Sequence, residues 1–290
     1  MFLPKKEIAL GKLIMIKYLL TKFPFLFILF MINGNVFAQD ADTVASEPAE
    51  VKYDFVIFSG KYNNAFNFFG RDFGQTIPFL STDIMYYFHS GFYINASGFK
   101  FIDTELPIQS SLSLGYRRDL SKNTDLNVSY SQFLVSGNSS VTGIQNLGLL
   151  QTTFGLDWNY LYSTIQVQGL FSERPDIFLS SQHSRFFQFD QKLFNAITVS
   201  FEPKFTVTAG TSRFYNLGSY PELEEPDIKK LEKLNILSWD FMLPVSFEYK
   251  SFEMEVFSRY VAPLNTPEFD NSRNRFIHGI QLNYFLAIKR

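Results

Sequence analysis

Hydrophobic and polar residues alternate with a period of two along the C-terminal part of the chain. The pattern is clearest in four segments, residues 197–209, 237–249, 252–262 and 276–288. Counted from the first residue of each segment, every second position is free of Asp, Glu, Lys and Arg. The charged residues stand at the positions between them: Glu202, Lys204, Asp240, Glu248, Glu253, Glu255 and Arg259. Successive side chains of a strand point to opposite faces, so this pattern indicates strands with one face that excludes charge.

The same alternation predicts twelve strands from Val51 onward. It is clear in residues 108–118, where Leu112 and Leu114 alternate with Ser111 and Ser113, but poor in the first strand and mixed in the eighth. Apolar outward faces with polar inward faces are typical of a barrel that crosses a membrane. We therefore expect an all-β, transmembrane, antiparallel, up-and-down barrel with strands at about 51–60, 80–89, 91–101, 108–118, 124–135, 146–158, 160–171, 176–189, 195–214, 236–249, 251–262 and 275–288.

The connections between these strands alternate in length. Short ones are expected at 89–91, 119–123, 158–160, 190–194 and 249–251, and longer ones at 61–79, 102–107, 136–145, 172–175, 215–235 and 263–274. An even strand number with short periplasmic turns and longer outer loops is the bacterial outer-membrane pattern. It places both ends of the barrel in the periplasm.

Two prolines fall inside predicted strands. Pro203 and Pro244 cannot donate to a ladder, so each predicts a bulge or a bend. The segment 195–214 could instead form two strands broken near Pro203, which would change the strand number and invert the topology after it.

The N-terminal residues are typical of a targeting segment. Lys17 and Lys22 precede the apolar run 23–32, and Val36 and Ala38 are the small residues that a signal peptidase reads. We predict a signal peptide over 1–38, with Met15 as an alternative start. The apolar run is too short for a membrane-spanning helix. Residues 39–50 are then a flexible periplasmic tail, and residues 51–290 are the barrel.

Composition narrows the function classes. Removal of 1–38 takes away five of the 26 basic residues and one of the 28 acidic ones, so the formal charge becomes −6, which argues against a nucleic-acid partner. The chain has no Cys, so it has no disulfide and no thiolate metal site, and its three His residues are scattered. We expect no metal and no cofactor. The 35 Phe and 15 Tyr residues suit a surface that faces acyl chains and membrane interfaces.

The last predicted strand contains the run Gly279-Ile280-Gln281-Leu282-Asn283-Tyr284. It resembles the C-terminal insertion signal of outer-membrane barrels, although the chain ends on Ile288-Lys289-Arg290 instead of a terminal Phe. As a whole, residues 51–290 resemble the porin-like barrel proteins of Gram-negative outer membranes. The resemblance implies outer-membrane lipids and the barrel-insertion machinery as partners, and channel or transport roles in some members. It names no substrate and no protein partner.

A catalytic alternative is an outer-membrane lipid hydrolase. Such an enzyme needs a Ser nucleophile within hydrogen-bond reach of a His, and these families place the two residues two apart on one strand face. None of His89, His183 and His278 is followed by Ser at that spacing. We therefore predict no enzymatic activity.

The inward-facing charged residues are the candidate functional set: Glu202, Lys204, Asp240, Glu248, Glu253, Glu255, Arg259 and Arg117. Such charges can line a narrow pore for ions or small solutes, with a cation bias or without specificity. They can equally pair across the lumen of a closed structural or partner-docking barrel. Twelve strands lie between the filled eight-stranded barrels and the wide porins, so both alternatives stay open.

Two of the predicted loops have sequences with more than one interpretation, and the alternation also fits one rival fold. Loop 61–79 is rich in Phe, and these side chains suit either a constriction inside the barrel or the headgroup belt. In loop 215–235, Asp227 can cap a short helix that serves as a lid or a docking site, or the loop is simply solvated. The main structural rival is a soluble periplasmic β-sandwich.

Overall fold

The structure is a computed structural model, and no helix in its described part is long and apolar enough to cross a membrane. The described residues are 53–102, 104–105, 107–134, 147–172, 174–217 and 229–289. The predicted signal peptide 1–38, the tail 39–50 and the proposed helix cap Asp227 lie outside this part, so they stay predictions.

Fourteen strands form one antiparallel sheet in the described part of the chain. They are β1 (Tyr53–Asn63), β2 (Phe79–Tyr87), β3 (Phe92–Phe101), β4 (Gln109–Ser121), β5 (Thr124–Leu134), β6 (Gly148–Asp157), β7 (Tyr162–Phe171), β8 (Asp176–Ser184), β9 (Phe187–Gln188), β10 (Thr198–Phe201), β11 (Lys204–Gly210), β12 (Asn235–Tyr249), β13 (Phe252–Pro263) and β14 (Arg275–Lys289).

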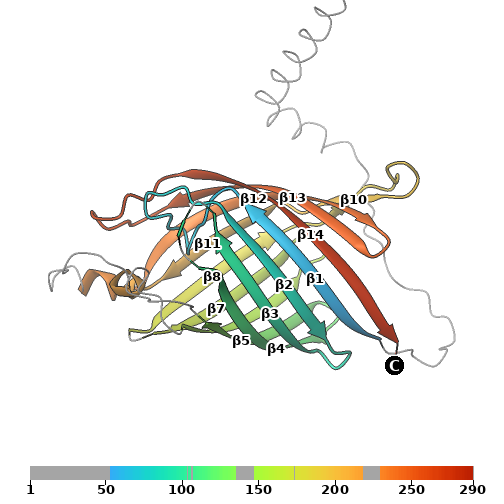
Figure 1. Cartoon of the computed structure of the whole chain (residues 1–290), viewed down its shortest axis with the longest axis horizontal. Helices are drawn as coiled ribbons and strands as arrows, with labels where there is room; N and C mark the ends of the chain where they lie inside the picture. Colours follow the sequence, from blue (N-terminus) through green and yellow to red (C-terminus); the bar gives the residue numbers. More distant parts are fainter. Residues whose placement is uncertain are drawn as a thin grey trace, which may run out of the picture. The chain divides into compact units, whose positions relative to one another are not determined.

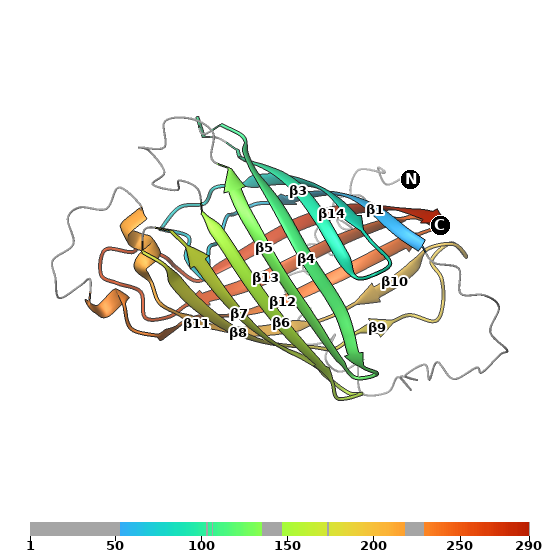
Figure 2. The same ribbon diagram turned by 90° about the horizontal axis from the view of Figure 1, so that it is seen from below.

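Twelve of these strands close into a barrel (Figures 1 and 2). β1 pairs with both β2 and β14, and β11 pairs with both β8 and β12, so the ring has no free edge. β9 and β10 form a short extension outside this ring. The predicted all-β, antiparallel, up-and-down barrel of about twelve strands is confirmed.

The expected strand 195–214 is divided at Glu202 and Pro203 into β10 and β11. Both parts run antiparallel to β12, so the division does not invert the topology. The expected strand 176–189 is divided too: β8 ends at Ser184 and β9 follows as a separate piece. The strands are divided here because Pro203 has no N–H to donate to the ladder. Its carbonyl oxygen accepts a hydrogen bond from the N–H of Arg185 (3.3 Å).

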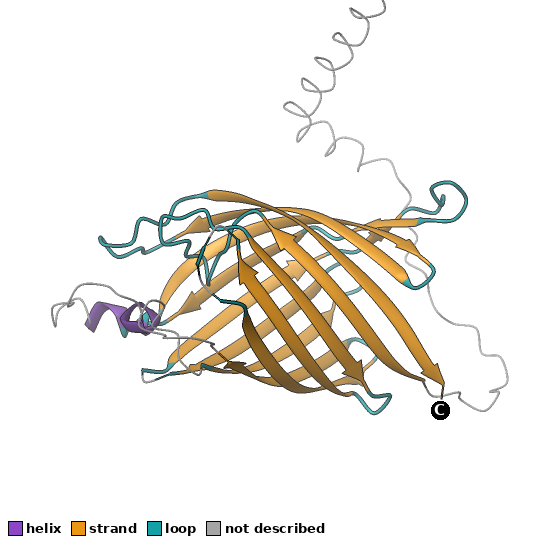
Figure 3. Cartoon of the chain, viewed as in Figure 1, coloured by secondary structure: helices purple, strands orange, loops and turns teal. Residues whose placement is uncertain are grey.

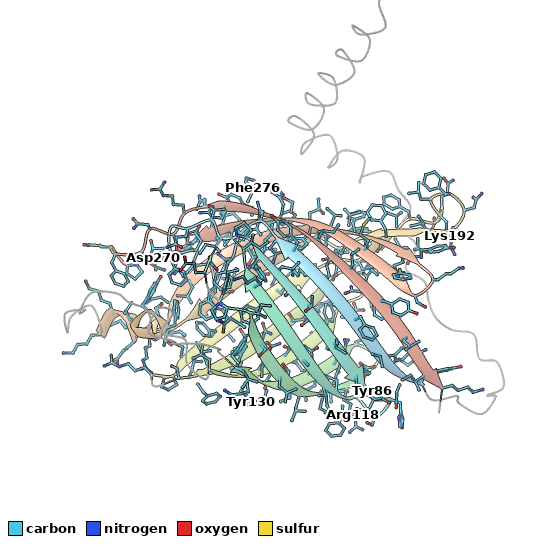
Figure 4. The ribbon with its side chains drawn as sticks, viewed as in Figure 1. Tyr86, Arg118, Tyr130, Lys192, Asp270 and Phe276 are labelled. Atoms are coloured by element: carbon cyan, nitrogen blue, oxygen red, sulfur yellow. The ribbon has the colours of Figure 1, made fainter. Side chains whose placement is uncertain are left out.

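Side chains alternate between the two faces of the wall as predicted. On β4, Leu112 and Leu114 are 49% and 56% exposed, whereas Ser111 and Ser113 are buried. Tyr130 and Phe276 likewise lie on the outer side of the wall (Figure 4). A hydrophobic outer face on a closed sheet is what a membrane requires, because every backbone group in the hydrocarbon must be paired.

One outward prediction is wrong. Leu237, expected on the charge-free outer face of its strand, is 1% exposed and belongs to an internal cluster. The pairing of β11 with β12 shifts by one residue between Thr208 and Ala209, which leaves Leu237 as the extra residue of a β-bulge. Such a bulge turns a side chain to the opposite face.

Long loops and short turns gather at opposite ends of the barrel (Figure 3). The loop end carries the connections 64–78, 264–274 and 211–234, the last including a 3-10 helix at Arg213–Leu217 and a helical turn at 229–231. The turn end holds the start of β1 and the end of β14, since Tyr53 pairs with Lys289. This polarity makes the loop end the extracellular one.

Candidate functional site

The first long loop folds into the barrel. Phe69 stacks on Phe178 of β8 with ring centroids 3.6 Å apart, and Phe178 is fully buried. Gly70, with a φ of +87°, lies so close to the wall that an added Cβ would stand 2.3 Å from Cβ of Ser238. Only glycine fits both this backbone conformation and this approach. Of the two possibilities raised for the loop, the inward one is what the structure adopts.

Apolar side chains pack around this loop at the loop end of the barrel. We call the set the mouth cluster. Its buried members come from the wall and from the loops: Leu147, Leu170, Phe178, Phe214, Tyr215, Leu231 and Leu237. Half-buried side chains pack against them: Phe68, Phe69, Phe73, Phe133, Leu149 and Phe269. The cluster joins residues more than 150 positions apart in the chain, so the loops at this end form one packed body.

A polar network fixes the loop to the β13–β14 connection. Arg71 is fully buried; its Nη2 donates to the carbonyl oxygen of Leu264 (2.7 Å), and its Nε lies 3.7 Å from Oδ2 of Asp270. Tyr215 donates a short hydrogen bond to the same carboxylate. Asp270 lies among the loops at the loop end (Figure 4). A buried charge pair of this kind holds its two segments in one arrangement.

Below the mouth cluster the lumen holds a polar cavity of about 490 Å³. Its upper boundary is the inserted loop, and its sides are strands β6, β7, β8, β11, β12 and β13. The lining residues are Asn67, Phe69, Gly70, Thr153, Thr164, Gln166, Gln168, Ser180, Gln182, Lys204, Thr206, Thr208, Asp240, Met242 and Arg259. Hydroxyl and amide groups dominate the lining on β6, β7 and β8, and the charged groups lie next to them on β11, β12 and β13.

The cavity's charged groups form ion pairs. Arg259 binds Asp240 with two parallel hydrogen bonds, Nε to Oδ1 (2.9 Å) and Nη2 to Oδ2 (2.8 Å). Lys204 lies 2.9 Å from Oε2 of Glu202, whose other oxygen accepts from the hydroxyl of Ser184 (2.7 Å). Bidentate pairing of a guanidinium with a carboxylate gives a fixed geometry and cancels both charges locally.

Three more of the predicted charged residues, Glu248, Glu253 and Glu255, lie nearer the turn end. Glu248 pairs with Glu253 across β12 and β13, and Glu253 accepts a hydrogen bond from Asn283 (2.9 Å). Glu255 lies two residues after Glu253, on the same face of β13 as Arg259. It interacts electrostatically with Lys204. Their contact with a solute stays a prediction.

Arg117 is the remaining predicted residue. It lies on β4 opposite Asn127, and its Nη2 stands 4.0 Å from Oδ1 of Asp125. The side chain is 56% exposed and does not line the cavity. The structure therefore does not bring it together with Asp240 and Arg259, and its pore-lining role also stays a prediction.

Some inward charges were not among the predicted residues, and Lys61 and Asp83 are two of them. Lys61 of β1 lies over the ring of Phe257 at 5.0 Å, and Asp83 of β2 accepts a hydrogen bond from Ser97 (2.5 Å). The first strand was expected to end at residue 60, one residue before Lys61. Asp83 alternates with Leu80 and other outward positions of a clear strand, so the period of two could have identified it.

A Ser–His contact lies on the outer face. Nδ1 of His183 is 2.9 Å from Oγ of Ser163 on the neighbouring strand, and Nε2 is 3.4 Å from Oγ of Ser181. The sequence search considered only Ser residues after each His, so it missed Ser181 two positions before and the cross-strand Ser163. Among the described residues no carboxylate binds this imidazole.

Comparisons with known proteins give the fold class. No family model matches the sequence, and no curated protein matches it. LpxR from Salmonella typhimurium is similar in structure with a TM-score of 0.51 at 6% identity, covering 80% of this chain and 100% of that one. A KdgM porin (TM-score 0.44, 11% identity) and a NanC porin (0.47, 7%) each match over 79% of this chain and 98% of their own. At these identities the likeness concerns the fold alone.

Proposed function

Because this chain is an outer-membrane β-barrel of the porin-like class, we propose that it forms a narrow pore for ions or small hydrophilic solutes. The observation that supports this most directly is the polar cavity of about 490 Å³ inside the wall. A barrel that served only as a membrane anchor would gain stability by filling this space with packed side chains. Here the wall instead presents hydroxyl and amide groups to an open space.

The mouth cluster acts in this proposal as a constriction. It places aromatic rings between the cavity and the extracellular side, and hydrophobic constrictions close channels by excluding water. The element that would have to move is the loop 64–78, which is held mainly by side-chain contacts, such as Phe69 on Phe178, Arg71 on the carbonyl of Leu264 and Asp72 on Arg275. Conduction therefore requires displacement of this loop, so we expect small or infrequent openings.

A closed structural or partner-docking barrel is the second candidate. The observation in its favour is the same mouth cluster, whose members Phe178, Tyr215 and Leu237 are at most 1% exposed. A permanently packed mouth would make the cavity a blind pocket open only toward the turn end. The two candidates differ in whether the loop leaves the mouth.

Planar bilayer recording separates them. The mature protein, refolded in detergent and shown to migrate anomalously on SDS gels until boiled, is inserted into a planar bilayer. Stepwise conductance supports the pore. Its absence in the folded protein, together with its absence in a variant with a weakened mouth cluster, leaves the closed barrel as the function.

The pairing of lumen charges bears on ion selectivity. Arg259 is neutralised by Asp240 and Lys204 by Glu202, so neither sign has an unpaired ring of charge at the cavity. Within the proposed pore, the alternative without specificity is better supported at this level than a strong cation bias. Glu248 and Glu253, nearer the turn end, add negative charge at the periplasmic mouth.

We also propose that the chain is not a lipid hydrolase. His183 and Ser163 do face the lipid side, but a catalytic imidazole needs a third group that orients it, and the ring contacts only hydroxyl groups among the described residues. Hydrolysis of a fluorescent phospholipid by the folded barrel, lost in the variant Ser163→Ala, would contradict this.

Insertion into the outer membrane is expected to depend on β14. This strand contains Gly279 to Tyr284 and closes the ring by pairing with β1 from Gly279 to Lys289. We propose that the barrel-insertion machinery reads this strand and that outer-membrane lipids contact its even-numbered side chains. Deletion of the last strand should leave the protein in the periplasm as an unfolded, degraded species.

A further inference from the structure

Neutral hydrogen-bonding side chains cover one continuous side of the cavity. The strand register places them in two neighbouring rows across β6, β7, β8 and β11. Adjacent strands lie about 4.8 Å apart, so each row presents a polar group at that interval. The first row is Thr153, Gln166, Ser180 and Thr208, and the second is Thr164, Gln182 and Thr206.

Two amides in these rows have no hydrogen-bond partner among the residues that the structure describes. Gln168, one row nearer the loop end, donates to Oε1 of Gln151 (2.9 Å). Gln166 and Gln182, in contrast, line the cavity without a hydrogen bond to any described residue. An amide offers two donors and an acceptor. Each of these groups can therefore bind either water or a solute that carries both donors and acceptors.

The charged groups that adjoin these rows, on β11, β12 and β13, give no free charge to an entering ion. The guanidinium of Arg259 is held by both oxygens of Asp240, and the ammonium of Lys204 by Glu202. A charged solute in a narrow lumen loses part of its hydration and needs an unpaired opposite charge in return. It would have to break one of these pairs to obtain it.

The size of the cavity limits the solute. A volume of about 490 Å³ corresponds to roughly 16 water molecules at ~30 Å³ each. This is a space for a mono- or disaccharide-sized molecule. The rim includes the ring of Phe69, which offers an apolar surface to the C–H face of such a molecule.

We infer that the cavity is a binding site for uncharged, polyhydroxylated solutes of the sugar class. The inference rests on the proposed function, because it names the solute class for the same lumen. Gln166 and Gln182 determine the specificity: a solute rich in hydroxyl groups satisfies both amides. An apolar solute leaves both amides without hydrogen bonds. A charged solute finds no unpaired opposite charge in the cavity.

Saturation-transfer NMR on the folded barrel in detergent tests this without any conductance. The probes are glucose, glucosamine and glucuronate, which share a ring and differ in charge. We expect glucose to bind, and both charged sugars to bind at least about tenfold more weakly. The double variant Gln166→Leu/Gln182→Leu should lower glucose binding about three- to tenfold for each amide removed.

The variant Gln132→Leu is the matched control. It makes the same change on the outward face of β5, where Gln132 pairs opposite Leu112, so glucose binding should not change. Equal binding of either charged sugar would overturn the inference, and so would unchanged glucose binding in the folded double variant. These outcomes are independent of the pore: a barrel that binds glucose but never conducts refutes the proposed function alone.

Discussion

Phe69 in the first long loop stacks face to face on Phe178 of β8, with ring centroids 3.6 Å apart and planes 9° apart. The two residues are separated by more than a hundred positions in the chain. Their contact closes the upper side of the cavity, because Phe69 lines that cavity and Phe178 belongs to the mouth cluster. This stacked pair is one of the contacts that join the loop to the wall, together with that of Phe68 on Phe178 and the ion pair of Asp72 with Arg275.

Removing this aromatic contact should open the barrel. In the variant Phe69→Ala the stacking and part of the apolar contact of the loop are lost, at a cost of up to about 3 kcal/mol because the ring is half-buried. Liposomes that contain the variant should swell faster in isotonic glucose than those with the native protein. The control is Phe58→Ala on the outer face of β1, where Phe58 is 43% exposed. Equal swelling rates for native and Phe69→Ala barrels would contradict the constriction.

The approach of the loop to the wall depends on Gly70. A Cβ there would stand 2.3 Å from Cβ of Ser238, on a backbone with φ of +87°. The variant Gly70→Ala should therefore expel the loop and become sensitive to added protease between residues 64 and 78. Gly60→Ala is the matched control, because nothing lies within 4 Å of a Cβ at that position. A protease-resistant Gly70→Ala barrel would show that the loop is held without this approach.

Arg71 should be the polar group that fixes the loop. Replacing it by Met keeps the length of the side chain but leaves the buried carboxylate of Asp270 without its cation, which costs about 3–5 kcal/mol locally. We expect faster hydrogen exchange in the connection 264–274 with an unchanged barrel, measured by mass spectrometry. Arg118→Met, at an exposed position, controls for the loss of a charge. Exchange in 264–274 that matches the native protein would refute this role.

The ion pair of Asp240 and Arg259 should keep the pore from favouring either anions or cations. Asp240→Asn leaves the guanidinium unpaired and should shift the reversal potential in a salt gradient toward anions. Arg259→Gln should shift it toward cations, and the double variant should return near the native value, because the two charges cancel. If both single variants and the double variant had the reversal potential of the native protein, the current would not pass this ion pair.

The alternation of side chains predicts most of the wall. One face of each strand meets lipid and the other meets the lumen, so apolar and polar residues alternate in the sequence. Strands such as 108–118 and 124–135 match β4 and β5 within a few residues. The exception is Leu237, which a one-residue bulge turns inward. A bulge depends on the register of two strands and not on the residues of one, so the period of two does not show it.

The site is less predictable than the wall. The pairing of Arg259 with Asp240 requires the register of β12 against β13, and the Ser163–His183 contact requires that of β7 against β8. The inward course of loop 64–78 depends on Phe178 and Tyr215, which are distant in the chain. Aromatic content alone fits both a loop inside the barrel and one in the headgroup belt, so the sequence left that choice open.

In the proposed function, solutes cross the membrane through the polar lumen and past the cavity. Because the chain has no Cys, single substitutions at two adjacent positions of β11 test it directly. Thr206 lines the cavity, and Val207 faces outward opposite Trp239. We predict that a bulky, charged thiol reagent added during single-channel recording blocks the current of Thr206→Cys and leaves that of Val207→Cys unchanged. Complete labelling of Thr206→Cys with no change in its current would contradict this proposal.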